Sequence, residues 1–211
     1  MELRDVRAVL LDMDGTLVDS DAAVERAWIT WAGEYGVEPA TALAIAPGCT
    51  SDRTVRRLLP ELNASAVAVA AARQLELQYD DLSDVTPAEG AHELLTVLGQ
   101  LGMSWAVVTS ADLRLANACL GAASITAPLL VTAEDVTDGK SDPEGYLRAA
   151  EQLGVAPRSC LVVEDAEPGL AAGRAADALT AALKHLTGDL CLDDLGQLTR
   201  LLTGTVEPAP R

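Results

Sequence analysis

The chain has 211 residues, of which 49% are hydrophobic, and it carries a formal net charge of −17. This length suits one core domain with a modest insertion, and the hydrophobic share is large enough to bury a core. A strongly negative field repels the nucleic-acid backbone and anionic membranes, so neither is an expected partner. A bound phosphate must then be held locally, by a metal ion, a lysine or helix N-termini.

The cysteines lie far apart in the sequence, as Cys49, Cys119, Cys160 and Cys191, without the paired spacing of a metal or redox site. A core of this size needs no disulfides, and no signal peptide is recognisable at the start of the sequence. The longest apolar runs are too short to span a bilayer. We therefore expect a cytoplasmic protein with reduced thiols that is a monomer or a weak dimer.

The first predicted strand covers residues 6–11, a short aliphatic run that ends in acidic residues and glycine. Residues 19–86 contain no convincing strand and are rich in Ala, Leu, Glu and Arg, which favours three or four helices, including residues 21–35, 51–59 and 65–79. We expect this stretch to form a helical cap domain, inserted into a core domain made of residues 1–18 and 87–211. Residues 204–211 are expected to form a frayed tail.

The remainder of the chain alternates between strand-like and helix-like segments. Aliphatic runs predict strands at residues 105–108, 129–132, 160–163 and 179–183. Segments with helical periodicity cover residues 113–120, 146–153 and 169–176. This alternation predicts an α/β fold, with a doubly wound, parallel, Rossmann-like sheet.

Residues suited to phosphoryl transfer follow four of the predicted strands. They are Asp12, Asp14, Gly15 and Thr16 after the first strand, then Thr109 and Ser110, then Lys140, and finally Glu164 and Asp165. Each alone has an ordinary explanation as a helix cap or a solvated side chain. Because the carboxyl ends of parallel strands meet at one edge of a sheet, we expect all of them to form one site.

The chemistry of these side chains suggests a role for each. Asp12 and Asp165 offer the hard oxygen ligands that Mg²⁺ prefers. A free oxygen of Asp12 can attack phosphorus and form an aspartyl-phosphate. Asp14 can protonate the leaving oxygen and later deprotonate the hydrolytic water. Thr109 and Lys140 can stabilise the charge that spreads over the phosphoryl oxygens.

The sequence resembles the haloacid dehalogenase superfamily of aspartate-nucleophile phosphatases, with a helical cap after the first strand. Four stretches carry the resemblance: LLDMDGTLVDS at 10–20, VVTSA at 107–111, GKSDPEGYLRAAEQLGV at 139–155 and CLVVEDAEPGLAAGRAA at 160–176. The resemblance implies Asp12 as nucleophile, Asp14 as acid and base, and Thr109 and Lys140 as phosphate clamps. It also implies Mg²⁺ binding by Asp12, the Asp14 backbone carbonyl and Asp165, with Glu164 as a direct or water-mediated ligand.

The expected substrate is a small phosphorylated metabolite, such as a sugar or polyol phosphate. On the phosphate side we assign substrate contacts to Gly15, Thr16, Ser110 and Ala111. In the cap, we assign them to Cys49 and Arg53. Many similar sugar- and glycerol-phosphate phosphatases carry His-Gly-Arg before the second cap helix, where this chain has Pro-Gly-Cys at 47–49.

Two alternatives stay open at this point. A phosphomutase of the β-phosphoglucomutase type shares all the core residues, but its cap arginine comes soon after the glycine, whereas here Arg53 is separated from Gly48 by four residues. A non-catalytic phosphate-binding protein on the same fold would lose a catalytic group, and none is missing. A dehalogenase is disfavoured because Asp14 is present, and a phospho-acceptor signalling domain because the chain has a helical insertion.

Overall fold

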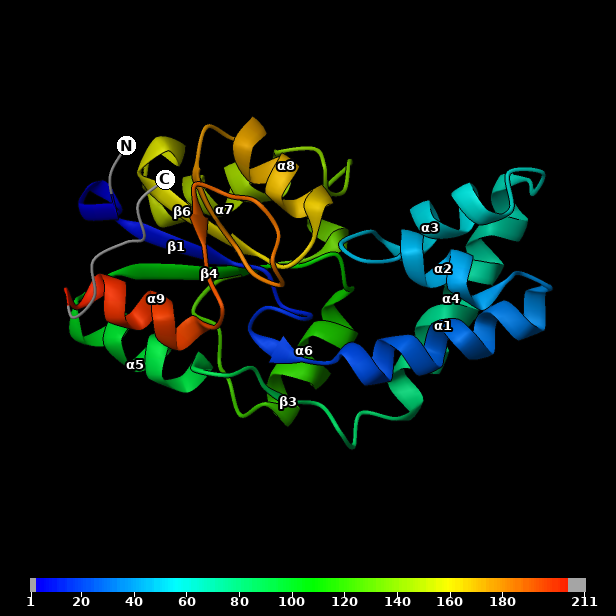
Figure 1. Ribbon diagram of the computed structural model, residues 1–211. Coiled ribbons are helices and arrows are strands. Elements are labelled where there is room, and N and C mark those ends of the chain that lie inside the picture. The colour runs from blue at the N-terminus through cyan, green and yellow to red at the C-terminus, as the bar shows by residue number, and fades with distance from the viewer. Residues whose placement is uncertain (1–2, 205–211) are drawn as a thin grey trace.

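The structure is a computed structural model that describes residues 3–204 of the chain (Figure 1). Its centre is a six-stranded sheet in the order β5-β4-β1-β6-β7-β8, in which every neighbouring pair is parallel. The strands are β1 (Ala8–Leu11), β4 (Ser104–Val108), β5 (Leu130–Val131), β6 (Cys160–Glu164), β7 (Leu179–Ala182) and β8 (Leu190–Cys191). The predicted α/β fold with a parallel, Rossmann-like sheet is confirmed.

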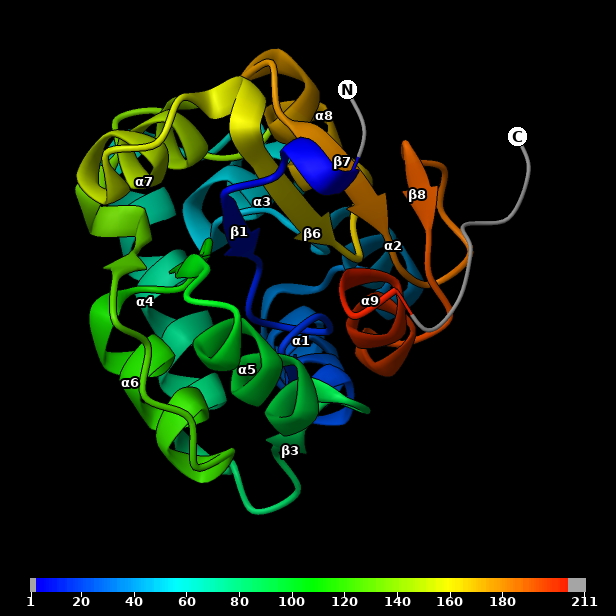
Figure 2. The ribbon, with the colours of Figure 1, turned by 90° about the vertical axis from the view of Figure 1, so that its left-hand side faces the viewer.

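Helices cover both faces of this sheet (Figure 2). On one face lie α7 (Glu144–Leu153) and α8 (Glu167–Ala175), and on the other lie α5 (Ala91–Gln100), α6 (Leu113–Ala122) and α9 (Leu195–Leu202). Leu10 of β1 packs in the first of these layers, and Val9 and Leu11 pack in the second. A central parallel strand is buried on both faces, which explains why β1 is an unbroken aliphatic run.

The cap is a separate bundle of helices, α1 (Asp21–Tyr35), α2 (Pro39–Ile45), α3 (Ser51–Leu58) and α4 (Ala64–Asp80). It has its own apolar cluster, in which the buried Trp31 indole donates a hydrogen bond of 2.8 Å to the carbonyl of Ala70. Figure 1 shows this bundle beside the carboxyl end of the sheet. The chain enters and leaves it through an antiparallel ribbon of β2 (Val18–Asp19) and β3 (Thr86–Pro87).

Several element boundaries differ from the prediction. β1 begins at Ala8, because Leu3–Asp5 forms a short 3-10 helix, η1, before it. β5 contains only Leu130–Val131, because Thr132 caps another short 3-10 helix, η2 (Ala133–Asp135); a third, η3 (Pro157–Ser159), precedes β6. The helices α5 and α9 and the edge strand β8 were not predicted.

Two further expectations concern the C-terminal end of the chain and helices that could cross a membrane. Residues 205–211, which make up most of the predicted frayed tail, lie outside the described residues. Among residues 3–204, no helix combines the length and the apolar character that crossing a membrane would require.

Candidate active site

The predicted site residues lie at the carboxyl end of the sheet, where it faces the cap. A cavity of about 450 Å³ separates the two parts. Its core side includes Asp12, Asp14, Thr109, Ser110, Ala111 and Asp165. Its cap side includes Val24, Glu25 and Trp28 of α1 and Cys49 from the loop before α3. Strand ends and a cap loop that lie far apart in the sequence therefore surround one cavity.

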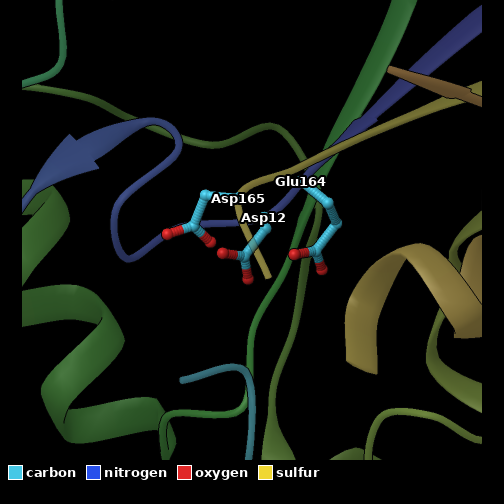
Figure 3. Close-up of side chains that lie close together, drawn as sticks. All are labelled: Asp12, Glu164 and Asp165. Carbon is cyan, nitrogen blue, oxygen red and sulfur yellow. The ribbon is translucent and has the colours of Figure 1, made fainter. Parts of the chain in front are cut away.

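Three carboxylates converge beneath this cavity (Figure 3). Asp12 follows β1, Glu164 ends the neighbouring strand β6, and Asp165 comes directly after it. Oxygen atoms of the three side chains lie within 4.8 Å of one another. Burial, together with the nearby charge of Glu164, raises the pKa of Asp12 to about 6 against the opposing effect of Lys140. Burial likewise raises the pKa of Asp165 to about 6.

Lys140 lies between two of these carboxylates. Its ammonium group is ion-paired with Asp12 and lies 2.7 Å from Oε1 of Glu164. The Tyr146 hydroxyl of α7 donates a hydrogen bond to the same Glu164 oxygen. Burial lowers the pKa of Lys140, but the Asp12 and Glu164 charges outweigh this and leave its pKa above the ordinary value. Lys140 therefore stays charged beside the predicted nucleophile.

The carboxylate cluster fits a divalent cation. Glu164 is fully buried, and its Oε2 atom has no hydrogen-bond partner among the described residues. A buried carboxylate oxygen without a donor is costly, and it needs a positively charged or hydrogen-bonding partner. Mg²⁺ binds through carboxylate oxygens of this kind. The geometry of Asp12, Glu164 and Asp165 is therefore compatible with the predicted Mg²⁺ site.

Asp14 belongs to the cavity wall, and its side chain is outside the three-carboxylate cluster. Its Oδ1 atom accepts a hydrogen bond of 2.6 Å from the hydroxyl of Ser20. Burial raises the pKa of Asp14 to about 6, while the Ser20 hydrogen bond opposes this rise and the Asp12 charge adds to it. A carboxyl group with this pKa can both give and take a proton near neutral pH, as acid–base catalysis requires.

The residues predicted to contact phosphate fall into two groups. Thr109, Ser110 and Ala111 line the cavity, and the amide of Ala111 donates a hydrogen bond of 3.0 Å to the Thr109 hydroxyl. Gly15 and Thr16 instead border a second hollow, which shares Asp21 and Lys184 with the cavity. The Thr16 hydroxyl is buried and has no partner among the described residues. A phosphate contact for Gly15 and Thr16 stays a prediction.

The cap touches the core directly above the site. The Ser110 hydroxyl donates a hydrogen bond of 3.0 Å to the carbonyl of Gly48. Gly48 has a φ of +71°, and a Cβ atom there would lie 3.0 Å from the Cβ of Ala166. A glycine therefore allows both the left-handed turn and the close approach of the cap loop to the core. Cys49 follows in this loop and lines the cavity, while its contact with substrate stays a prediction.

Arg53 occupies a different place from the one its predicted role suggests. It is not among the described residues that line the cavity. Its guanidinium donates hydrogen bonds to the backbone carbonyls of Lys140 and Gly139. The structure thus places Arg53 against the loop that carries Lys140, where it joins the cap helix α3 to the core.

Sequence reasoning missed three polar side chains at the site. Ser20 bonds to Asp14, Tyr146 bonds to Glu164, and Lys184 lies 2.9 Å from Oδ2 of Asp165. Lys184 follows β7 at the same edge of the sheet, so the strand-end argument would have found it if extended to the fifth predicted strand. Ser20 and Tyr146 both lie within stretches that carried the family resemblance, at 10–20 and 139–155.

Comparison with known proteins identifies the family. The model of the haloacid dehalogenase-like hydrolases matches residues 6–177. Hexitol phosphatase A of Escherichia coli is 37% identical over 201 residues, covering 92% of this chain and 93% of that protein. 2-deoxyglucose-6-phosphate phosphatase 1 of Saccharomyces cerevisiae is 31% identical over 205 residues, which are 89% of this chain and 83% of that protein.

A solved structure gives the same result. A putative β-phosphoglucomutase from Bacteroides vulgatus superimposes with a TM-score of 0.81 at 27% identity, covering 96% of this chain and 91% of that one. The chain belongs to the haloacid dehalogenase-like hydrolase family. Its named phosphatase relatives confirm the predicted class of enzyme, a phosphoric monoester hydrolase.

Proposed function

We propose that this protein is a Mg²⁺-dependent phosphatase that hydrolyses a small sugar or polyol phosphate through an aspartyl-phosphate on Asp12. One observation carries the proposal: Asp12 and Asp14 line the same small cavity, with Lys140 ion-paired to Asp12 on its core side. A nucleophile, an acid–base group and a fixed cation are the parts that phosphoryl transfer requires.

In the first step, a carboxylate oxygen of Asp12 attacks phosphorus, and the bond from phosphorus to the sugar oxygen breaks. Asp14, in its protonated form, gives its proton to that leaving oxygen. The products of this step are the free alcohol and a phosphorylated Asp12. The fixed charge of Lys140, together with the Thr109 hydroxyl, stabilises the negative charge on the transferring group.

In the second step, Asp14 accepts a proton from a water molecule as the water oxygen attacks phosphorus. The bond between phosphorus and Asp12 breaks, which releases inorganic phosphate and restores both carboxyl groups. Asp12, Glu164, Asp165 and the backbone carbonyl of Asp14 would hold Mg²⁺. When bound, the ion supplies positive charge that offsets the carboxylates and the phosphate dianion.

The cavity supports a small, polyhydroxylated leaving group. A volume of about 450 Å³ suits a metabolite rather than a protein substrate. Trp28 and Val24 of α1 offer apolar surface for the carbon skeleton, and Glu25 and Gln78 offer polar atoms for hydroxyl groups. The names of two relatives, hexitol phosphatase A and 2-deoxyglucose-6-phosphate phosphatase 1, point to substrates of this kind.

The charge of the cavity favours hydrolysis over the phosphomutase alternative. Among its described lining residues, Lys184 is the one that carries a positive charge, and this lysine is ion-paired with Asp21 and Asp165. A mutase turns over a bisphosphate, whose second phosphate also needs a cation. The cap side of this cavity presents Glu25 instead, which repels a second phosphate.

Release of inorganic phosphate from a panel of hexitol, hexose, pentose and glycerol phosphates tests the proposal. With Mg²⁺ present, at least one sugar or polyol phosphate should be hydrolysed. Asp12→Asn should lower turnover by several orders of magnitude, since a neutral amide cannot attack phosphorus. Asp80→Asn, at an exposed position of α4, is the matched control and should leave turnover unchanged. More than about a tenth of wild-type turnover in Asp12→Asn would contradict the covalent mechanism.

The same panel separates the phosphatase from its alternatives. Interconversion of hexose phosphate isomers that depends on an added bisphosphate would identify a mutase. Binding of phosphate compounds without turnover would identify a non-catalytic protein. We also infer a cytoplasmic monomer or weak dimer, which sedimentation of the purified protein and fractionation of the cells that make it would check.

A further inference from the structure

Lys184 connects the candidate metal site to the first residue of the cap helix α1. Its ammonium nitrogen lies 2.9 Å from Oδ2 of Asp165. The same nitrogen lies 2.8 Å from Oδ1 and 2.6 Å from Oδ2 of Asp21, where α1 begins. One side chain of the core therefore holds a carboxylate of the site and a carboxylate of the cap at the same time.

The backbone after β7 is shaped to bring Lys184 to this point. Lys184 and His185 both have positive φ angles, of 50° and 61°. Side chains with a Cβ atom disfavour this left-handed conformation, and residues held in it tend to cluster at functional sites. Just before them, the amide of Leu183 donates a hydrogen bond of 2.8 Å to the carbonyl of Glu164, which ties the turn to the strand that ends at the site.

Gly15 leaves the space that this ion pair occupies. A Cβ atom at position 15 would lie 2.6 Å from the Lys184 nitrogen and 2.2 Å from Oδ2 of Asp165. Contacts this short are not tolerated, so any larger residue would displace one of the two groups. The glycine in the loop after β1 therefore permits Lys184 and Asp165 to meet beside that loop.

The partner of Lys184 in the cap belongs to a helix that forms part of the cavity wall. Asp21 shares α1 with Glu25 and Trp28, which lie one and two turns further along and line the cavity. Two other contacts join different parts of the cap to the core. Ser110 of the core bonds to the loop before α3, and Tyr79 of α4 bonds to the core. Lys184 thus acts on α1, close to the β2–β3 ribbon where the cap joins the core.

We propose that Lys184 is a positioning residue for this reaction: it holds the start of α1 against the site, and so sets how the α1 face closes on the substrate. The proposal rests on the phosphatase function proposed above. Lys184 and Asp21 are both partly exposed, and pairs of this kind are worth about twofold to fivefold in an equilibrium constant. Because the pair acts on the position of the α1 wall and not on the reacting groups, we expect its effect in substrate affinity rather than in turnover.

The test measures kcat and KM for the best sugar phosphate in Lys184→Met, Asp21→Asn, the double variant and Lys184→Arg. Lys184→Met and Asp21→Asn should each raise KM by about twofold to fivefold and change kcat by less than about twofold. The double variant should match Lys184→Met, because both changes remove the same interaction. Lys184→Arg should restore most of the affinity. Arg174→Met removes a comparably exposed ion pair on α8 and should change nothing.

Two outcomes would overturn the proposal. Effects on KM that multiply in the double variant would show that Lys184 acts independently of Asp21. Loss of kcat in Lys184→Met with an unchanged KM would make it part of the chemistry instead.

Amide hydrogen exchange in the first turns of α1 gives an answer that does not depend on turnover. Exchange should be faster in Lys184→Met and in Asp21→Asn than in the wild type, with Mg²⁺ and inorganic phosphate present, and unchanged in Arg174→Met. Unchanged exchange in Lys184→Met would overturn the proposal even if the enzyme is a phosphatase. Faster exchange in a protein that hydrolyses nothing on the panel would support it, while the proposed function would fail.

Discussion

The hydroxyl of Ser20 donates a hydrogen bond of 2.6 Å to Oδ1 of Asp14, six residues earlier in the chain. Ser20 is buried and immediately precedes the cap helix α1, so it connects the start of the cap to the proposed acid–base residue. Among the influences on the pKa of Asp14, this hydrogen bond is the largest that opposes the effect of burial. Removing it should therefore change the pH at which Asp14 works.

Ser20→Ala should move the acid side of the pH–rate profile to higher pH. The carboxylate of Asp14 loses a hydrogen bond that stabilises its charged form, so its pKa rises above about 6. Since Asp14 must be ionised to accept the proton of the water, kcat should start to fall at a pH about one unit higher than in the wild type. Ser65→Ala, at an exposed position of α4, is the control. An unchanged profile would remove Ser20 from the acid–base pair.

Stability should depend on pH in opposite ways with and without Mg²⁺. The pKa values of Asp12 and Asp165 are raised to about 6 in the folded protein, so the folded state binds more protons than the unfolded state between about pH 4 and 6. In EDTA, the free energy of unfolding should therefore increase as the pH falls from 7 to 5. Denaturant unfolding at the two pH values measures this change.

Adding Mg²⁺ should stabilise the protein most at the higher pH, because the ion binds the ionised carboxylates. Activity should disappear in EDTA and return with Mg²⁺, while Ca²⁺ should inhibit because it accepts a looser coordination geometry. Full activity in EDTA would contradict the metal requirement. A free energy of unfolding that rises with pH in EDTA would contradict the assignment of raised pKa values.

Gly169→Ala and Gly99→Ala form a matched pair of helix substitutions with opposite expected effects. A Cβ atom at Gly169 of α8 would lie 1.8 Å from Oε1 of Glu164, whereas one at Gly99 of α5 would meet nothing within 4 Å. Gly169→Ala should displace Glu164, reduce the stabilisation by Mg²⁺ and destabilise the fold by about 1–3 kcal/mol. Gly99→Ala should leave activity intact and stabilise α5 by up to about 1 kcal/mol.

Thermal unfolding with and without Mg²⁺, together with phosphate release, distinguishes the two variants. A Gly169→Ala protein with wild-type response to Mg²⁺ would show that Glu164 does not need its present position to support the metal site. Such a result would limit the proposed ligands to Asp12, Asp165 and the Asp14 carbonyl.

The core sheet could be predicted from sequence because its central strands are aliphatic runs, and because each run ends where polar residues begin. Val9 to Asp12 shows this change within four residues. The same local signal placed Asp12, Lys140 and Asp165 at one edge of the sheet. It could not find α5 and α9, which are ordinary amphipathic helices that cover one face of the sheet without carrying any site residue.

The contacts between cap and core could not be predicted in the same way. They depend on how the insertion sits over the sheet, which no local pattern in the sequence encodes. Lys184 meets Asp21 across 163 positions of the chain, and Ser110 meets Gly48 across 62. Arg53 is an example: the sequence predicted the helix that carries it, but not the backbone carbonyls of the core that its guanidinium contacts.

Arg53→Ala tests the place that the structure gives to this residue. The guanidinium bonds to the backbone carbonyls of Gly139 and Lys140, so its loss should loosen the loop that carries Lys140. We expect kcat to fall by about threefold to tenfold on both a sugar phosphate and p-nitrophenyl phosphate, because Lys140 serves every substrate. Arg56→Ala, on the exposed side of the same helix, is the control. A rise in KM for the sugar phosphate alone would instead return Arg53 to the substrate-binding role that the sequence suggested.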